Sequence, residues 1–360
     1  VVFLTVALSW SAFALQMKSK PTHMDTIVNP ADCSACHAGI GAKGTPLLLE
    51  KKETICFRCH GIMGKGNAST NVQSAFMKPS RHPVVETTMY HSRDEELPEK
   101  DSLKPRHVSC YDCHVSHITT VEKPNKGARG YTPSKLRVNM KGMPPGGLKL
   151  KEATAEFELC YLCHSDSANL PANSRNVSLD FDPTNASYHP LEMPGRNKDV
   201  PSLVRDLNVN SVVTCGDCHG NDDRQGPRGP HGSIYKPLLV AEYRTEHGME
   251  SPKAYSLCYG CHDRRSILQN ESFSKHKEHI VFYGGGTSCR TCHASHGSRM
   301  RTNLIEFSKE RVSSSMNAGG PEYFPFVPRR PKCSLNCHGA EHNAMDEKGG
   351  AAGRPWPQGL

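Results

Sequence analysis

Cysteine pairing constrains this chain more than any other feature of its sequence. All sixteen cysteines fall into eight pairs, and a histidine follows the second cysteine of every pair. Seven pairs read C-x-x-C-H, whereas the eighth, CSLNCH, has three residues between its cysteines. The pairs are Cys33 and Cys36, Cys56 and Cys59, Cys110 and Cys113, Cys160 and Cys163, Cys215 and Cys218, Cys258 and Cys261, Cys289 and Cys292, and Cys333 and Cys337. The histidines that follow them are His37, His60, His114, His164, His219, His262, His293 and His338.

This spacing is typical of covalent haem c attachment. Two thiols add across the haem vinyl groups, and the histidine that follows ligates the iron from the proximal side. Zinc ribbons also use C-x-x-C pairs, but they need no histidine after each pair. Thioredoxin-like sites use a single pair within a βαβ unit, and a disulfide scaffold would not enforce one spacing. The pattern therefore predicts eight c-type haems, with sixteen thioether links and eight proximal histidines.

Composition indicates that side-chain burial alone does not hold the fold. Hydrophobic residues make up 36% of the chain, which also has 30 Gly and 26 Pro, and the mean hydropathy is −0.57. So little apolar surface does not offset the entropy of ordering the chain. We therefore expect mostly irregular coil with short α-helices at the motifs, very few strands, and haems as the core. Without haem the chain should be largely unfolded, because cofactor binding supplies folding energy.

The motifs are organised into internal repeats. The stretches ETICFRCHG, FELCYLCHS and YSLCYGCHD are alike, and each is followed by a second motif in HVSCYDCHVSH, VVTCGDCHGND or GTSCRTCHASHGS. This predicts two-haem repeats at about 56–117, 160–231 and 258–296, with single haems at 33–37 and 333–338. Polar connectors rich in Gly and Pro separate them. The whole haem-binding region is expected to span 15–342.

The paired motifs, the His-Pro-hydrophobic step before the second motif, and the terminal His-Gly-Ser resemble the doubled-CXXCH multihaem cytochromes of metal-reducing and sulfur-cycling bacteria. The resemblance covers about residues 56–298 and implies that most irons carry a second, distal histidine. Repeat position favours histidines just before or just after each second motif: His82, His117, His189, His231, His279 and His296. His23, His107 and His276 form a second group of candidates. For His91, His247 and His342 we expect solvated surface positions, and the 12 Met residues keep no fixed offset from the motifs.

Bis-histidine irons have no open coordination position, so they pass electrons without readily binding substrate. We therefore expect an electron-transfer protein and no enzyme. Its partners would be donor and acceptor cytochromes or extracellular electron acceptors. A polymeric filament is one form of this hypothesis, because surplus histidines near both ends, His23 and His342, would permit ligation of a neighbouring subunit's iron. Two alternatives stay open: an octahaem redox enzyme of the nitrite, hydroxylamine or tetrathionate type, and a subunit of an outer-membrane electron conduit.

Residues 1–14 predict a signal peptide, because an apolar run ends in Ala12-Phe13-Ala14, although the initiating Met and basic start are missing. The chain should then be exported to the periplasm or cell exterior, without an integral membrane span. Residues 343–360 read as a flexible tail. The formal charge of +8 would become about −8 once eight haems add sixteen propionates, so we expect Lys and Arg to pair with propionates and no nucleic-acid binding.

The eighth motif differs from the others in two ways. Its extra residue should be absorbed as a bulge in the turn between Cys333 and Cys337, and it has no paired second motif. His342 lies only four residues beyond His338. We do not expect His338 and His342 to ligate the same iron, so His342 should serve another haem. The distal ligands of the Cys33 and Cys333 haems stay unassigned.

Overall fold

The computed structural model describes residues 36–38, 47–51, 54–64, 70–84, 108–114, 138–139, 149–150, 155–165, 175–191, 193–204, 206–282, 286–316, 320–325, 331–337 and 339–343. Several predictions fall outside these ranges: the signal peptide, the tail from residue 344 onward, Cys33, His23, His91, His107, His117 and His338. None of the helices within the ranges has the length and apolar character that a membrane crossing needs.

Regular structure is sparse in the described ranges, which confirms the prediction of irregular coil with short helices. The longest helix has nine residues and the longest strand six; strands are more numerous than expected, but most have two residues. The α-helices are α2 (Phe57–His60), α3 (Gln73–Phe76), α4 (Cys110–Cys113), α5 (Glu156–His164), α6 (Ser256–Tyr259), α7 (Arg264–Leu268) and α8 (Cys289–Cys292). Two 3₁₀ turns, η2 (Val177–Leu179) and η3 (Cys215–Asp217), and one π turn, η4 (Glu278–Phe282), accompany them. The strands are β1 (Ser80–Arg81), β2 (Val138–Asn139), β3 (Lys149–Leu150), β4 (Ser187–Tyr188), β5 (Gly232–Ser233), β6 (Gly297–Ser298), β7 (Val312–Ser313), β8 (Glu322–Phe324), β9 (Lys332–Cys337) and β10 (Ala340–His342).

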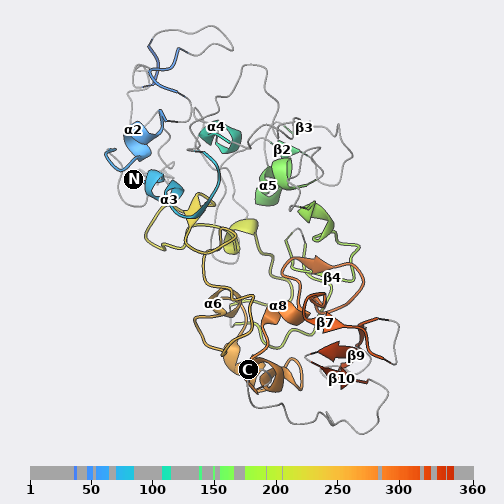
Figure 1. Ribbon diagram of the computed structural model, residues 1–360. Helices are drawn as coiled ribbons and strands as arrows, with labels where there is room; N and C mark the ends of the chain where they lie inside the picture. Colours follow the sequence, from blue (N-terminus) through green and yellow to red (C-terminus); the bar gives the residue numbers. More distant parts are fainter. Residues whose placement is uncertain are drawn as a thin grey trace, which may run out of the picture.

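Figure 1 shows that these elements follow one another along the molecule roughly in sequence order, from α2 at one end to β9 and β10 at the other. Neighbouring parts of the sequence therefore stay neighbours in space. This arrangement is typical of repeat proteins, in which each unit contacts mainly the units before and after it.

Five of the described haem-type motifs fold as single helical turns. In each of them the amide of the motif histidine donates to the carbonyl of the first cysteine, at 2.7–2.9 Å. The residue before the first cysteine caps two of these turns: the Ser109 amide donates to Asp112 Oδ2 at 2.6 Å, and the Thr214 amide to Asp217 Oδ2 at 2.8 Å. Each aspartate lies between the two cysteines, so the sequence S/T-C-x-D-C contains both residues of a capping box.

Two small sheets join consecutive repeats. Strand β1 pairs with β5, and β4 pairs with β6, each through two antiparallel residue pairs. In both cases the strand before the second motif of one repeat meets the His-Gly-Ser of the next. The glycine is required there, because a Cβ on Gly232 would lie 1.8 Å from the Ala75 carbonyl oxygen and one on Gly297 would lie 1.9 Å from the Asp180 oxygen.

The eighth motif corrects the prediction of a bulged turn. Cys333 and Cys337 lie on the extended strand β9, which pairs with β7, β8 and β10. Side chains alternate along a strand, so residues four apart share a face whereas residues three apart do not. The extra residue therefore lets an extended segment present both thiols on one face. Leu335 between them is buried against Phe307 and Val312.

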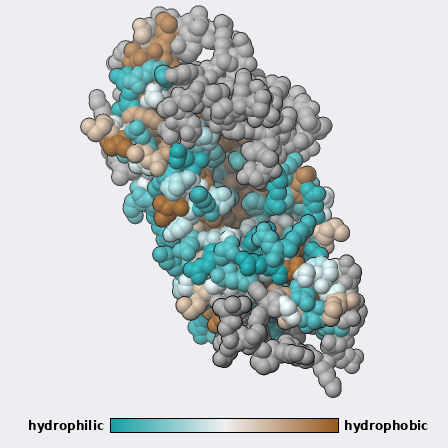
Figure 2. Space-filling model, in the orientation of Figure 1, coloured by the Kyte–Doolittle hydropathy of each residue, from teal (hydrophilic) through white to brown (hydrophobic). Residues whose placement is uncertain are grey.

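Apolar packing is limited to small clusters in the described ranges. One contains Tyr161, Phe181 and Leu191, and another Ile305, Phe307, Val312 and Leu335. Figure 2 shows apolar side chains set back among hydrophilic ones in the middle of the molecule. A continuous cavity of about 3390 Å³ lies between these clusters. Ligand sites usually measure about 300–1,000 Å³, so this one has room for several large groups.

Replacement of Gly297 by Ala should weaken the junction between the second and third repeats. The new methyl group would overlap the Asp180 carbonyl, and forced overlap of this kind costs about 1–3 kcal/mol. Gly195→Ala is the matched control, because its Cβ would meet only the Tyr188 oxygen at 3.7 Å. We expect a lower thermal midpoint of the holoprotein for Gly297→Ala than for Gly195→Ala; equal midpoints would contradict the close approach.

Candidate haem-binding sites

Histidine side chains face one another in pairs throughout the described ranges. Five pairs combine a motif histidine with a second histidine, and their ring centroids lie 6.2–6.4 Å apart. Metal–imidazole bonds of about 2 Å, as in zinc sites, would put two imidazoles on opposite sides of one metal with centroids roughly 6.3 Å apart. The spacing therefore fits one haem iron between each pair. The pairs are His114 with His231, His164 with His82, His219 with His296, His262 with His189, and His293 with His276.

Backbone carbonyls orient several of these rings. The Nδ1–H of His82 donates to the Pro230 carbonyl at 2.6 Å, and that of His189 to the Ser295 carbonyl at 2.5 Å. His219 and His293 make the same kind of bond at 3.0 Å, to the carbonyls of Pro237 and Asn303. A ring that donates from Nδ1 keeps its Nε2 lone pair for a metal. The donor set thus fits haem iron in both chemistry and tautomer.

Burial keeps four of these imidazoles uncharged. It lowers the pKa of His231 and His276 to about 3 and that of His219 and His262 to about 4, with a further contribution from neighbouring histidines. An imidazole must be neutral to bind a metal. At pH 7 the rings are therefore in the form that iron ligation needs.

Four of the five pairs cross a repeat boundary. His82 of the first repeat faces His164 of the second, and His231 of the second faces His114 of the first. The second and third repeats exchange histidines in the same manner: His189 faces His262, and His296 faces His219. We call this the reciprocal exchange. The junction sheets β1–β5 and β4–β6 lie beside the exchanged residues and hold them in place.

Thiols gather at the centre of each repeat. The first cysteines of the two motifs share a hydrogen bond in all three repeats: Cys56 with Cys110, Cys160 with Cys215, and Cys258 with Cys289.

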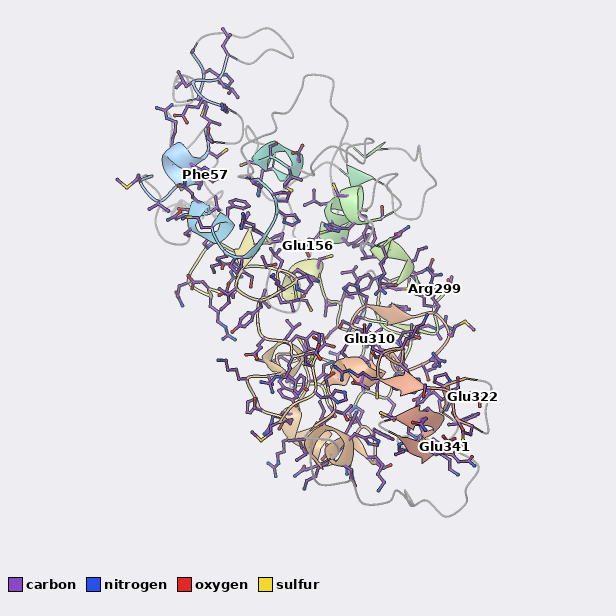
Figure 3. The ribbon with its side chains drawn as sticks, in the orientation of Figure 1. Phe57, Glu156, Arg299, Glu310, Glu322 and Glu341 are labelled. Atoms are coloured by element: carbon purple, nitrogen blue, oxygen red, sulfur yellow. The ribbon has the colours of Figure 1, made fainter. Side chains whose placement is uncertain are left out.

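A buried carboxylate fastens the two motifs of the second repeat. Glu156, in the first turn of α5, accepts the Gly216 amide at 3.0 and 3.2 Å and is 4% exposed (Figure 3). Burial raises its pKa. The two motifs of each predicted repeat thus lie side by side.

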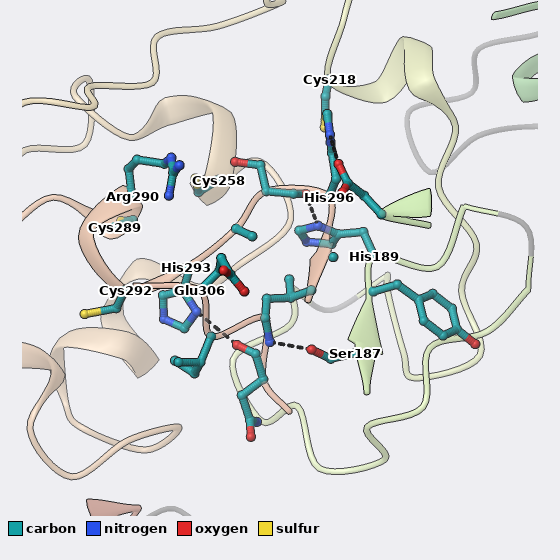
Figure 4. Close-up of a pocket in the computed structure, with 18 of the residues that line it drawn as sticks. Ser187, His189, Cys218, Cys258, Cys289, Arg290, Cys292, His293, His296 and Glu306 are labelled. Carbon is teal, nitrogen blue, oxygen red and sulfur yellow. Dashed lines mark hydrogen bonds and ion pairs between the residues drawn. The ribbon is translucent and has the colours of Figure 1, made fainter. Parts of the chain in front are cut away.

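The paired histidines form a row in sequence order. The pKa of His231 is lowered by burial and then by His114, His82 and His60, so these sites adjoin. After the effect of burial, His164 contributes to the lowered pKa of His219, and His296 and His293 contribute to that of His189. Figure 4 shows His189, His293 and His296 gathered in one pocket with the thiols of Cys289 and Cys292 beside them.

The Cys33–His37 motif resembles the second motifs of the repeats. His37 forms an isolated bridge with Leu48, just as His219 does with Leu239 and His293 with Ile305. The flanking bonds are equivalent: the amide after each motif histidine donates to the residue before its bridge partner at 2.7–2.8 Å. This single motif therefore occupies the second position of an incomplete repeat.

His342 and His247 are half-buried and so lack the solvated surface positions considered for them. The ring centroid of His342, which the sequence also predicts to serve another haem, lies 6.2 Å from that of His279, and neither residue directly follows a described cysteine pair. The Nε2 of His247 lies 3.2 Å from Thr291 Oγ1, in the seventh motif. Apart from His342, every histidine in these ring pairs is one that the sequence analysis names as a proximal or distal candidate, but repeat position did not predict which ring faces which.

Two family models match parts of the chain. Residues 146–304 match the outer membrane cytochrome MtrC/MtrF-like, domains II/IV, and residues 26–65 match the doubled CXXCH motif. No curated protein and no solved structure matches the chain.

Replacement of His296 by Ala should leave one iron without its second imidazole, because His296 faces His219 across the repeat boundary. We expect a new high-spin ferric signal in the electron paramagnetic resonance spectrum of the oxidised holoprotein. His247→Ala is the control and should keep the wild-type spectrum. An unchanged spectrum for His296→Ala would show that this pair does not share an iron.

Proposed function

Because the chain is a multihaem c-type cytochrome that transfers electrons, we propose that it carries eight covalent haems in one row, mostly with two histidine ligands each. Haem iron supplies reversible one-electron chemistry when bound, and the protein provides spacing, ligation and protection from solvent. The row of histidine pairs, four of which line a single cavity, is the observation that carries this proposal. Five pairs with no open position favour electron transfer over substrate turnover.

The reciprocal exchange extends to the start of the chain. Since the Cys33 motif occupies the second position of an incomplete repeat, the rule assigns His117 of the first repeat to its iron. The rule likewise assigns His23, which precedes the Cys33 motif, to the iron of the Cys56 site. All eight sites would then have two imidazoles, and His91, His107 and His247 would have other roles.

For location, we propose that the protein works outside the inner membrane, in the periplasm or at the cell exterior. The predicted signal peptide and the similarity to domains of an outer membrane cytochrome support this. The same similarity favours a conduit subunit as the second candidate. A filament remains testable, but His342 faces a histidine of its own chain, so the intersubunit role considered for it gains no support.

The number and ligation of haems test this proposal. Mass spectrometry of the holoprotein, compared with the mass of the chain, should show eight haems, because the sequence has eight cysteine pairs. Electron paramagnetic resonance of the oxidised protein should show low-spin iron only. A high-spin fraction near one haem in eight would instead favour the enzyme alternative.

Production of the chain without haem attachment should leave it largely unfolded. The described apolar clusters contain only three and four buried residues, so the large cavity between them would collapse without its contents. Far-ultraviolet circular dichroism and chemical denaturation should show low helix content and no cooperative transition. A cooperative transition in the haem-free chain would contradict a haem core.

A further inference from the structure

We infer that His342, and not His338, is the axial ligand that completes the Cys333–Cys337 haem site, opposite His279. This inference rests on the proposed function, since it assumes a haem at the eighth motif. It gives the last site the pattern C-x₃-C-x₄-H in place of C-x₃-C-H.

The spacing between His279 and His342 is the first support. Their ring centroids lie 6.2 Å apart, within the range of the five pairs that contain a described motif histidine. The Nδ1–H of His279 donates to the Lys275 carbonyl at 2.7 Å, which leaves Nε2 for a metal as in His82 and His189. Geometry and tautomer therefore match those of the other sites.

Strand register places His342 with the two thiols. In the β9–β10 hairpin, His342 pairs with Leu335 and Ala340 pairs with Cys337. Residues opposite each other on antiparallel strands share a face of the sheet. His342 therefore lies on the face of β9 that carries Cys333, Leu335 and Cys337.

Elimination assigns the thiols to this histidine pair. Five other described cysteine pairs already have a motif histidine that faces a partner, and the pair Cys56 and Cys59 is followed by its own described histidine, His60. Cys333 and Cys337 line the same cavity as His279 and His342. They also adjoin the preceding site in the row, because Cys333 and Cys337 pack against the same apolar cluster as Cys292.

The structure holds His342 in position from several sides. Gly339, at φ +74°, provides the left-handed residue that a tight turn between β9 and β10 requires. Glu341 accepts the Met316 amide at 3.0 Å and bonds to the Ser315 hydroxyl and the Asn336 side chain. Strand β10 is thus fixed to β9 on one side and to the 315–316 segment on the other.

The reciprocal exchange also leads to the eighth site. His82 and His189 each precede a second motif and face the first motif histidine of the next repeat. His279 precedes the second motif of the third repeat, so its partner should belong to the first motif of the incomplete repeat that follows. That partner is His342.

Methionine substitutions test the assignment in the holoprotein. A histidine–methionine iron shows an absorption band in the far red and a higher reduction potential than a bis-histidine iron. We expect both in His342→Met, with the haem count unchanged, and neither in His338→Met. His247→Met is the control, because the Nε2 of His247 contacts the Thr291 hydroxyl. The band in His338→Met, or an unchanged spectrum in His342→Met, would overturn the inference.

The wild-type protein separates failure of this inference from failure of the proposed function. Eight low-spin haems in the wild type, together with either overturning result, would leave the proposed function standing and reject only the ligand assignment. A wild-type mass that lacks the eighth haem would reject the proposed function at this site, and the inference with it. Loss of one haem in His338→Met, with the band present in His342→Met, would still support axial ligation by His342.

Discussion

The pairing of imidazoles across repeat boundaries is the interaction on which the rest of this structure depends. The first and second repeats each supply one histidine to the repeat after them and receive one from it, so ligation in the proposed row of haems would be interlocked with chain connectivity. The two-residue sheets, the glycine contacts and the carbonyl bonds to Nδ1 lie at these boundaries. They are too small to stabilise a fold by themselves. Their role is to set the distance between two rings.

Interlocked ligation has a consequence for cooperativity. In most repeat proteins a unit folds on its own stability plus contact with its neighbours. The second repeat, if it were isolated, would lack the facing imidazole at both of its sites, because His82 and His296 belong to its neighbours. We therefore expect stability to rise steeply once two neighbouring repeats are present, because each completes the other.

The sequence predicted the chemistry of this protein better than its geometry. The cysteine pairs, the irregular fold and the histidines at repeat positions such as His82 and His231 followed from local spacing. Their partners did not, because His231 and His114 are more than a hundred residues apart and repeat similarity gives no direction of exchange. The eighth motif was misread for a related reason. A helical turn was assumed from the other seven motifs, whereas C-x₃-C suits the two-residue period of a strand.

His276 shows how the row is closed within the chain. The site of His293 would, by the exchange rule, receive its second imidazole from a complete repeat beyond it, and His276 of the same repeat fills that place instead. A histidine of the same repeat thus takes the place of the imidazole that the next repeat would supply in the reciprocal exchange. In the proposed row of haems, whole repeats could then be inserted between existing ones to lengthen the electron path, while the site of His293 keeps its partner His276.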